Sequence, residues 1–418
     1  MTPDTQQNPA VPVINREFDF TLEAGILLVL GLFMFIFGIL LFKIQTGELP
    51  YTPDSTYGLF LVLIALQVIT MGKTPFGEVH RTWLVILLGI GAGILGMTAC
   101  FIPGALSFII RDLVGILLVI GGTALLLQVF LVKERAAVWI QIPGILRHLT
   151  LSCGLVYLLG VILGLVTLMP GLTTNSGTAT LLILDGISLF YLAWSIQNVS
   201  KLYPPTKAPA AAQVPRGTEG VSFFLRDAPL SFTIAILIFL GVLLALLAIL
   251  LVPVNLGIIP FSPDGQLGLL IVIMAIQVIA MGETPVGQFR RSWLIVAIGL
   301  LFVTLGVISS IVPGLLTSTL VVVLAVLNIL GGVVPLTLRF LPLLNAMRNP
   351  PAQPVVIPPP LKKLLITQTV LNVVGILFGL SMILPGLIPG LVVAVILFAN
   401  GLLLFLLAYI LHGLPTVA

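Results

Sequence analysis

Residues 57–83 read YGLFLVLIALQVITMGKTPFGEVHRTW, and residues 267–293 read LGLLIVIMAIQVIAMGETPVGQFRRSW. The two stretches align without a gap at an offset of 210 residues, so that Gln67 matches Gln277 and Trp83 matches Trp293. Self-similarity at a constant offset indicates that a structural unit has been repeated within the chain. We therefore interpret the protein as a tandem duplication.

The duplication extends over nearly the whole chain. The offset of 210 continues as far as the glycine pairs at 121–122 and 331–332, and it becomes 215 further on, where Gly186 matches Gly401. This slip falls in a segment between residues 130 and 148 that we interpret as a loop, where insertions are tolerated. We expect a first unit at 1–200, a Pro/Ala-rich linker at 201–228 and a second unit at 229–418.

The composition places these units in a membrane. Hydrophobic residues make up 59% of the chain and charged residues 8%, and the mean hydropathy is +1.25. Soluble domains carry about 25% charged residues. Apolar runs such as Leu22–Phe42 and Leu230–Val252 match the roughly 20 residues that a helix needs to cross a bilayer, whereas membrane β-strands are shorter and alternate in polarity. We predict an all-α integral membrane protein.

We predict about twelve transmembrane helices, arranged as two six-helix repeats. The first-unit spans are Leu22–Phe42, Thr56–Met71, Thr82–Ile102, Leu113–Val132, Leu149–Met169 and Gly177–Ile196. The second-unit spans are Leu230–Val252, Leu267–Met281, Ser292–Val312, Leu315–Leu338, Leu364–Leu384 and Leu391–Leu411. An even number of spans in each unit makes the two repeats enter the membrane in the same direction, as parallel repeats.

The basic residues give the orientation. With twelve spans, 16 of the 18 Lys and Arg residues fall on one side of the membrane, and only Lys43 and Arg111 fall on the other. Cytoplasmic loops carry the excess of Lys and Arg. We therefore expect a multi-pass protein of the cell (inner) membrane with both termini in the cytoplasm. We expect Arg111 to pair with Asp112 at the outer interface.

Pro-Gly pairs recur between the spans. They lie at Pro103-Gly104, Pro170-Gly171, Pro313-Gly314 and Pro385-Gly386. Proline ends the outgoing helix and glycine accepts the tight turn. Preceding glycines, including the Gly160/Gly164 pair at GxxxG spacing, predict close packing of the two helices within each hairpin. The pattern indicates a two-helix unit used three times in each half, with the first pair the most diverged.

This pattern of a Gly-spaced apolar helix, a Pro turn and a second helix ending in Gly-Gly resembles the HdeD-type acid-resistance membrane proteins. Those are six-helix bacterial inner-membrane proteins, so the chain looks like two such units fused. The resemblance implies an inner-membrane protein with no known enzymatic activity. It carries no site residues over to this sequence.

Few polar residues fall inside the predicted spans. Asp185 is the one acid placed deep within a helix, and Asn400 is its counterpart in the second unit. An intramembrane carboxylate indicates a functional site by default, here a proton or substrate role, and the alternative that we favour is an interhelical hydrogen bond or a packing role. Gln67 and Gln277 occupy equivalent positions in the short second and eighth spans. We expect these glutamines, with Asn328 and Asn372, to hydrogen-bond across helices.

The loop after each second helix is the most distinctive motif. Its candidate residues are Gly72, Thr74, Pro75, Gly77, Arg81 and Trp83 in the first unit, and Gly282, Thr284, Pro285, Gly287, Arg291 and Trp293 in the second. Glycine can close the helix, Pro and Gly shape a turn, and Arg and Trp are typical interfacial anchors. We interpret the loop as a cytoplasmic anchor at the membrane surface. The more specific alternative is a loop that docks a partner or gates a path. Its position is similar to that of the cytoplasmic loop of major-facilitator transporters, without that family's acidic residue.

No pattern in the sequence indicates catalysis. The three histidines do not pair with each other, and no Cys/His cluster or nucleotide-binding glycine pattern occurs. The net charge of +4 comes without a dense basic cluster, so we expect no nucleic-acid partner. We expect no metal, no cofactor and no enzyme activity. The expected partners are the lipid bilayer and either other membrane subunits or a second copy of the chain.

Two functional hypotheses remain. The first is a non-catalytic membrane protein, either an HdeD-like stress protein or an accessory subunit of a larger complex, and the abundance of helix-packing glycines favours it. The alternative is a secondary transporter of a small solute or ion, with a path between two pseudo-symmetric halves. Twelve spans and a long middle linker favour the alternative, but a coupled carrier usually needs more ionisable residues at the membrane midplane.

Overall fold

The computed structural model describes residues 21–70, 73–74, 77–78, 82–104, 106–131, 144–202, 228, 230–281, 283–284, 287–288, 293–348, 359–384, 386 and 388–412. Twelve helices lie in these residues. In the first half they are α1 (Leu22–Gln45), α2 (Pro53–Thr70), α3 (Trp83–Phe101), α4 (Ser107–Leu131), α6 (Ile145–Leu168) and α7 (Asn175–Leu202). In the second half they are α8 (Phe232–Asn255), α9 (Pro263–Met281), α10 (Trp293–Ile311), α11 (Thr317–Arg348), α12 (Pro359–Ile383) and α13 (Gly390–His412).

Length and composition make this a multi-pass helical membrane protein. Eleven of the described helices are long and apolar enough to cross a bilayer, and α9 contains the shorter apolar segment Pro263–Ile276. Helices α2 and α9 begin earlier than their predicted spans, because Pro53 and Pro263 occupy the first helical turn, where proline costs no hydrogen bond. The 18 residues of α2 give it a length of roughly 27 Å, close to the thickness of the hydrocarbon core.

Several helix boundaries differ from the predicted spans. Helix α4 begins at Ser107 instead of at residue 113, so Arg111 and Asp112 lie inside its second turn. Helix α11 continues to Arg348, ten residues beyond the predicted end at residue 338. Helix α7 continues to Leu202, two residues into the predicted linker. Each of these extensions includes a charged residue, Arg111, Arg339 or Lys201, because a helical backbone continues past a charge that interrupts an apolar run.

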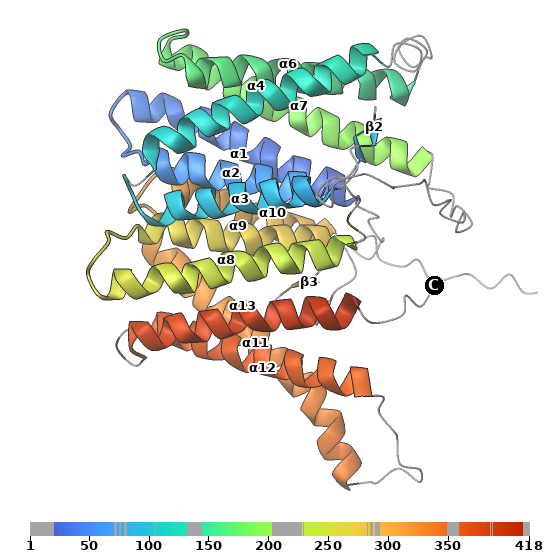
Figure 1. Ribbon diagram of the computed structural model, residues 1–418, viewed down its shortest axis with the longest axis vertical. Helices are drawn as coiled ribbons and strands as arrows, with labels where there is room; N and C mark the ends of the chain where they lie inside the picture. The colour runs from blue at the N-terminus through green and yellow to red at the C-terminus, as the bar shows by residue number, and fades with distance from the viewer. Residues whose placement is uncertain are drawn as a thin grey trace, which may run out of the picture.

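The Pro-Gly turns form as predicted. Gly104, Gly171, Gly314 and Gly386 have φ angles between 81° and 97°, a left-handed conformation that glycine adopts without strain. Gly47 and its counterpart Gly257 also have positive φ angles, of 76° and 69°, and they follow α1 and α8. All these turns lie at one end of the helices, which we call the turn end. Those that Figure 1 shows are on its left side.

The glycine contacts differ from the prediction. A Cβ atom built on Gly58 of α2 would lie 2.5 Å from the carbonyl oxygen of Gly96 in α3, and one built on Gly96 would lie 2.6 Å from the carbonyl oxygen of Gly58. Gly96 therefore packs α3 against α2 and not against α4, the helix that follows its Pro-Gly turn. The prediction that these glycines pack the two helices of each Pro-Gly hairpin is wrong, because a tight turn sets the direction of the chain and not its packing partner.

One glycine of each GxxxG pair does approach another helix backbone closely, but that helix is not the one across the Pro-Gly turn. A Cβ atom on Gly164 would lie 2.9 Å from the carbonyl oxygen of Gly115 in α4, whereas one on Gly160 would meet nothing within 4 Å. In α12, Gly379 is similarly close to α11, and a Cβ atom on Gly375 would make only an ordinary contact at 3.7 Å. Only the second glycine of each pair faces the neighbouring helix backbone.

The two halves pack helix for helix in the same manner. The main pairs are α1 with α7, α2 with α3 and α4 with α6 in the first half, and α8 with α13, α9 with α10 and α11 with α12 in the second. Helices α1, α2 and α3 meet α8, α9 and α10 at the centre of the molecule. Figure 1 shows the first half above and the second half below this contact, with α4 and α6 at one extreme and α11 and α12 at the other.

Candidate functional site

Asp185 lies in the middle of α7 and is 4% exposed. Its Oδ1 atom has no hydrogen-bond partner among the described residues, and its backbone carbonyl accepts a hydrogen bond from the Ser188 hydroxyl at 2.8 Å. The next residue explains the burial, since a Cβ atom on Gly186 would lie 2.7 Å from the backbone nitrogen of Phe35 and 2.8 Å from the carbonyl oxygen of Gly31 in α1. The predicted burial of this carboxyl group is confirmed.

The counterpart of Asp185 lies in a similar backbone setting. Asn400 is half-buried in α13, and the adjacent Gly401 packs against Gly241 of α8 as Gly186 packs against Gly31. The two helix contacts are therefore built alike, but only the first surrounds a buried ionisable group. This difference makes a symmetric proton path through both positions unsupported.

The other predicted polar residues are more dispersed. Gln67 is half-buried in α2, and the side chain of Gln277 lies outside the described residues. The side-chain nitrogen of Asn328 donates to the carbonyl oxygen of Leu324 at 2.8 Å, one turn back in the same helix. The cross-helix hydrogen bond predicted for Asn328 is therefore wrong, because the helix itself offers an acceptor within reach.

Replacing Asp185 by leucine is expected to stabilise the protein. The carboxyl group is buried with an unpaired oxygen, and such a group costs about 1–3 kcal/mol. Leucine branches at the same atom without needing a hydrogen bond, so we expect the free energy of unfolding to rise by a similar amount. Denaturant unfolding in detergent micelles, followed by circular dichroism, measures the change.

Asn400→Leu is the matched control, because Asn400 is only half-buried and should gain less. A clear loss of stability in Asp185→Leu, with Asn400→Leu unchanged, would contradict the prediction. It would mean that the carboxyl group makes a stabilising interaction in the membrane.

The two distinctive loops contain short β-hairpins. Strand β1 (Lys73–Thr74) pairs antiparallel with β2 (Gly77–Glu78), and β3 (Glu283–Thr284) pairs with β4 (Gly287–Gln288). In both, the threonine is opposite the glycine. The sequence predicted a turn in each loop but not the pairing of two strands. Gly72, Pro75, Arg81, Gly282, Pro285 and Arg291 lie outside the described residues.

Trp83 and Trp293 mark the starts of equivalent helices. Trp83 is the first residue of α3 and is half-buried, and the Thr82 hydroxyl caps this helix by accepting from the backbone nitrogen of Val85 at 3.4 Å. Trp293 begins α10. Both tryptophans thus lie at a helix end, where an interfacial anchor is expected.

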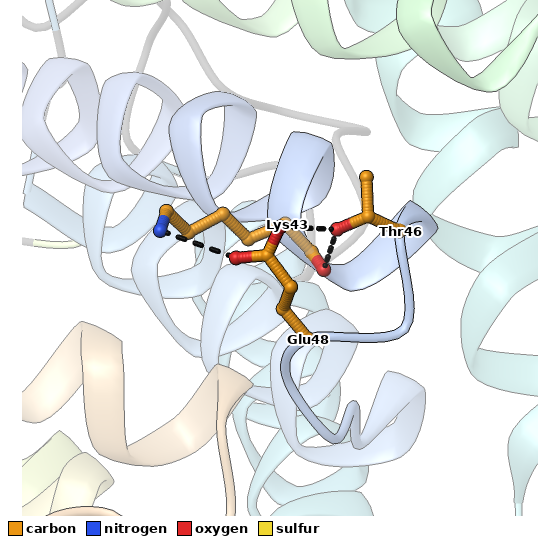
Figure 2. Close-up of polar contacts among 3 residues, drawn as sticks. All are labelled: Lys43, Thr46 and Glu48. Carbon is orange, nitrogen blue, oxygen red and sulfur yellow. Dashed lines mark hydrogen bonds and ion pairs between the residues drawn. The ribbon is translucent and has the colours of Figure 1, made fainter.

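The two basic residues at the turn end are both paired with an acid. Figure 2 shows Lys43, whose Nζ lies 3.3 Å from Glu48 Oε2, and Thr46, whose hydroxyl donates to Glu48 Oε1 at 3.0 Å. The Thr46 hydrogen bond, followed by Lys43, lowers the pKa of Glu48. The Arg111 Nη2 atom lies 3.0 Å from Asp112 Oδ1, so the ion pair predicted from the sequence is confirmed.

The contact between the halves is apolar and closed. Leu63 and Leu66 of α2, Phe239 of α8, and Val272 and Ile276 of α9 line the space at this contact, which measures about 10 Å³. That is about the minimum for one water molecule, and the walls offer no polar partner to hold it. This part of the structure contains no solute path between the halves.

Two polar contacts were not predicted from the sequence. The Gln197 side-chain oxygen accepts from the backbone nitrogen of Thr21 at 3.0 Å and joins the end of α7 to the start of α1. The Arg339 guanidinium donates to Gln368 Oε1 at 2.7 Å and Thr369 Oγ1 at 2.8 Å, and so joins α11 to α12. Both contacts depend on which helices are neighbours in the fold. The spacing of residues along the chain does not reveal those neighbours.

The described residues hold no group of three or more His, Cys, Asp or Glu side chains arranged to bind a metal ion. Both cysteines are buried and free. No family model matches the chain, and comparisons with curated proteins and with solved structures return no match. Functional inference therefore rests on the geometry of the molecule.

Proposed function

We propose that this protein is a non-catalytic component of the inner membrane, built as two parallel six-helix repeats. In this role it is either an HdeD-like stress protein or an accessory subunit of a membrane complex. The observation that carries the proposal is the closed, apolar contact between the halves. A carrier would need its solute path there, so the packing supports a structural role.

The pattern of contacts supports the two-repeat arrangement. Helix α1 contacts α10 as α8 contacts α3, α1 contacts α9 as α8 contacts α2, and α2 contacts α10 as α9 contacts α3. Exchanging the halves leaves this set unchanged, as in an isologous interface with a twofold axis. Two backbone hydrogen bonds are likewise related by exchange of the halves. The Thr52 nitrogen donates to the Ile311 carbonyl oxygen at 3.1 Å, and the Ser262 nitrogen donates to the Phe101 carbonyl oxygen at 2.9 Å.

The distribution of charge supports cytoplasmic termini. Lys43 and Arg111 at the turn end each form an ion pair with a nearby carboxylate. The opposite end of the helices carries Lys73, Arg147, Lys201, Arg339, Lys362 and Lys363. An excess of Lys and Arg is typical of the cytoplasmic side. The proposal therefore places the turn end outside.

Cysteine labelling tests this proposal without knowledge of any substrate. Leu63→Cys and Ile273→Cys place thiols in the contact between the halves, and Thr46→Cys places one in an exposed turn. With a membrane-impermeant maleimide on intact cells, we expect labelling at position 46 only. The native cysteines are buried and give a low background.

Labelling at position 63 or 273 would show that water reaches the contact between the halves and would favour the transporter. Absence of labelling at position 46 in intact cells, with labelling in inverted vesicles, would reverse the orientation.

Purification in mild detergent tests the accessory role, for which we expect a second membrane chain in stoichiometric amount. A single, monomeric chain would contradict that role.

A further inference from the structure

A cavity of about 300 Å³ lies within the first half at the turn end, between α1, α2, α4, α6 and α7. Its volume is at the lower end of the roughly 300–1,000 Å³ typical of ligand pockets. Phe33, Phe37 and Phe60 contribute to an apolar wall, and Thr173 and Asn175 line the cavity at the α6–α7 turn. Arg111 is the one charged residue among the described residues that line it.

The duplicated sequence provides an internal comparison for this cavity. Seven polar lining residues have apolar or glycine counterparts at the equivalent positions of the second half. The pairs are Tyr51 and Phe261, Tyr57 and Leu267, Arg111 and Val321, Thr167 and Met382, Thr173 and Ile388, Asn175 and Gly390, and Thr178 and Val393. Most of the polar lining therefore belongs to the first half, and Thr56, whose counterpart is Gln266, is the exception.

The equivalent region of the second half is filled. Leu267, Val321 and Met382 pack there in a hydrophobic cluster with Ile271 and Leu324. The two halves share the same helix pairing but differ in this region, where the second half is packed with apolar side chains and the first keeps a partly polar cavity. Empty space lowers stability, because its walls lose packing contacts. A bound ligand offsets that cost.

We propose that this cavity binds a single-chain amphiphile with an anionic head group. The aromatic wall suits one alkyl chain, and the volume is too small for two chains together with a head group. Arg111 lines the cavity one turn into α4, and its side chain is 35% exposed. Its Nε and Nη2 atoms donate to Asp112, and a guanidinium carries five donors in all. The others are available to a carboxylate or phosphate, with tyrosine and threonine hydroxyls as neutral partners.

Equilibrium binding of radiolabelled dodecanoate to the full-length protein in nanodiscs tests the proposal, with empty nanodiscs as the blank. We expect one saturable site per chain and at least tenfold weaker binding of dodecanol, which has the same chain without the charge. Lysophosphatidate, with one chain and a phosphate head group, distinguishes a membrane lipid from a free fatty acid as the natural source. Absence of saturable binding of both anions, or equal affinity for dodecanol, would overturn the proposal.

Two variants test the residues by copying the second half. Arg111→Val should weaken dodecanoate binding at least tenfold, and Thr167→Met should abolish it by filling the cavity. Lys43→Val is the matched control, because Lys43 is a basic residue at the same end of the helices but outside the cavity. Wild-type affinity in both cavity variants, or an equal loss in Lys43→Val, would overturn the assignment. The comparison of dodecanoate with dodecanol uses the wild-type protein, so it still tests the proposal if a variant fails to fold.

Discussion

Gly96→Val is expected to lower the free energy of unfolding by about 3 kcal/mol or more, at or above the upper end of the range for overpacked cores. The new side chain would enter the contact between α2 and α3, where even a Cβ atom would lie 2.6 Å from the Gly58 carbonyl oxygen. A backbone oxygen in a helix cannot move aside as a side chain does, so the helices must separate. Denaturant unfolding in detergent, followed by circular dichroism, measures the loss.

Gly91→Val is the control for this prediction. Gly91 lies in the same helix, five residues earlier, and a Cβ atom there would meet nothing within 4 Å. The control carries the same helix-propensity cost, so the difference between the variants isolates the helix contact. Equal losses would mean that propensity, and not packing, explains the effect.

Gly93→Val and Phe239→Val are each expected to destabilise the protein, and the double variant is expected to recover stability. A Cβ atom on Gly93 would lie 2.4 Å from the Phe239 ring, so valine at position 93 overpacks the contact between the halves and costs about 1–3 kcal/mol. Phe239 is 1% exposed, and its truncation leaves a cavity. The equivalent positions in the other half hold Val303 and Val29, both buried, so the double variant reproduces the native pair.

Denaturant unfolding of the four proteins in a double-mutant cycle measures the coupling. We expect a coupling free energy of about 1–3 kcal/mol in favour of the double variant, within the range for residues in contact. Gly91→Val combined with Phe239→Val is the control and should be additive. Additivity of Gly93→Val with Phe239→Val would contradict the direct contact and, with it, the equivalence of the two central contacts.

The sequence alone determined the class of structure. Long apolar runs predict membrane helices because a backbone in hydrocarbon must satisfy its own hydrogen bonds, and that requirement is local. The Pro-Gly turns are local too, since glycine at positions such as Gly104 permits the positive φ angle. Burial of Asp185 followed from its place at the centre of an apolar run.

The partner of each helix was decided only by the tertiary structure. Gly91 and Gly96 are the same residue type in the same helix, yet only Gly96 meets another backbone. Helices joined by a Pro-Gly turn need not pack closely, and α3 packs on α2 instead. Packing between apolar helices depends on the fit of whole surfaces, which no short spacing encodes.

The cavity also depends on tertiary structure. It is lined by residues from five helices, and Arg111 becomes one of its walls only when α4 lies beside α2 and α6. From the sequence alone, we predicted only that Arg111 and Asp112 form an ion pair at the outer interface. Comparison of the two halves identifies the positions that differ, but these positions are scattered along the chain. They come together only because the packing of five helices places them along the wall of one cavity.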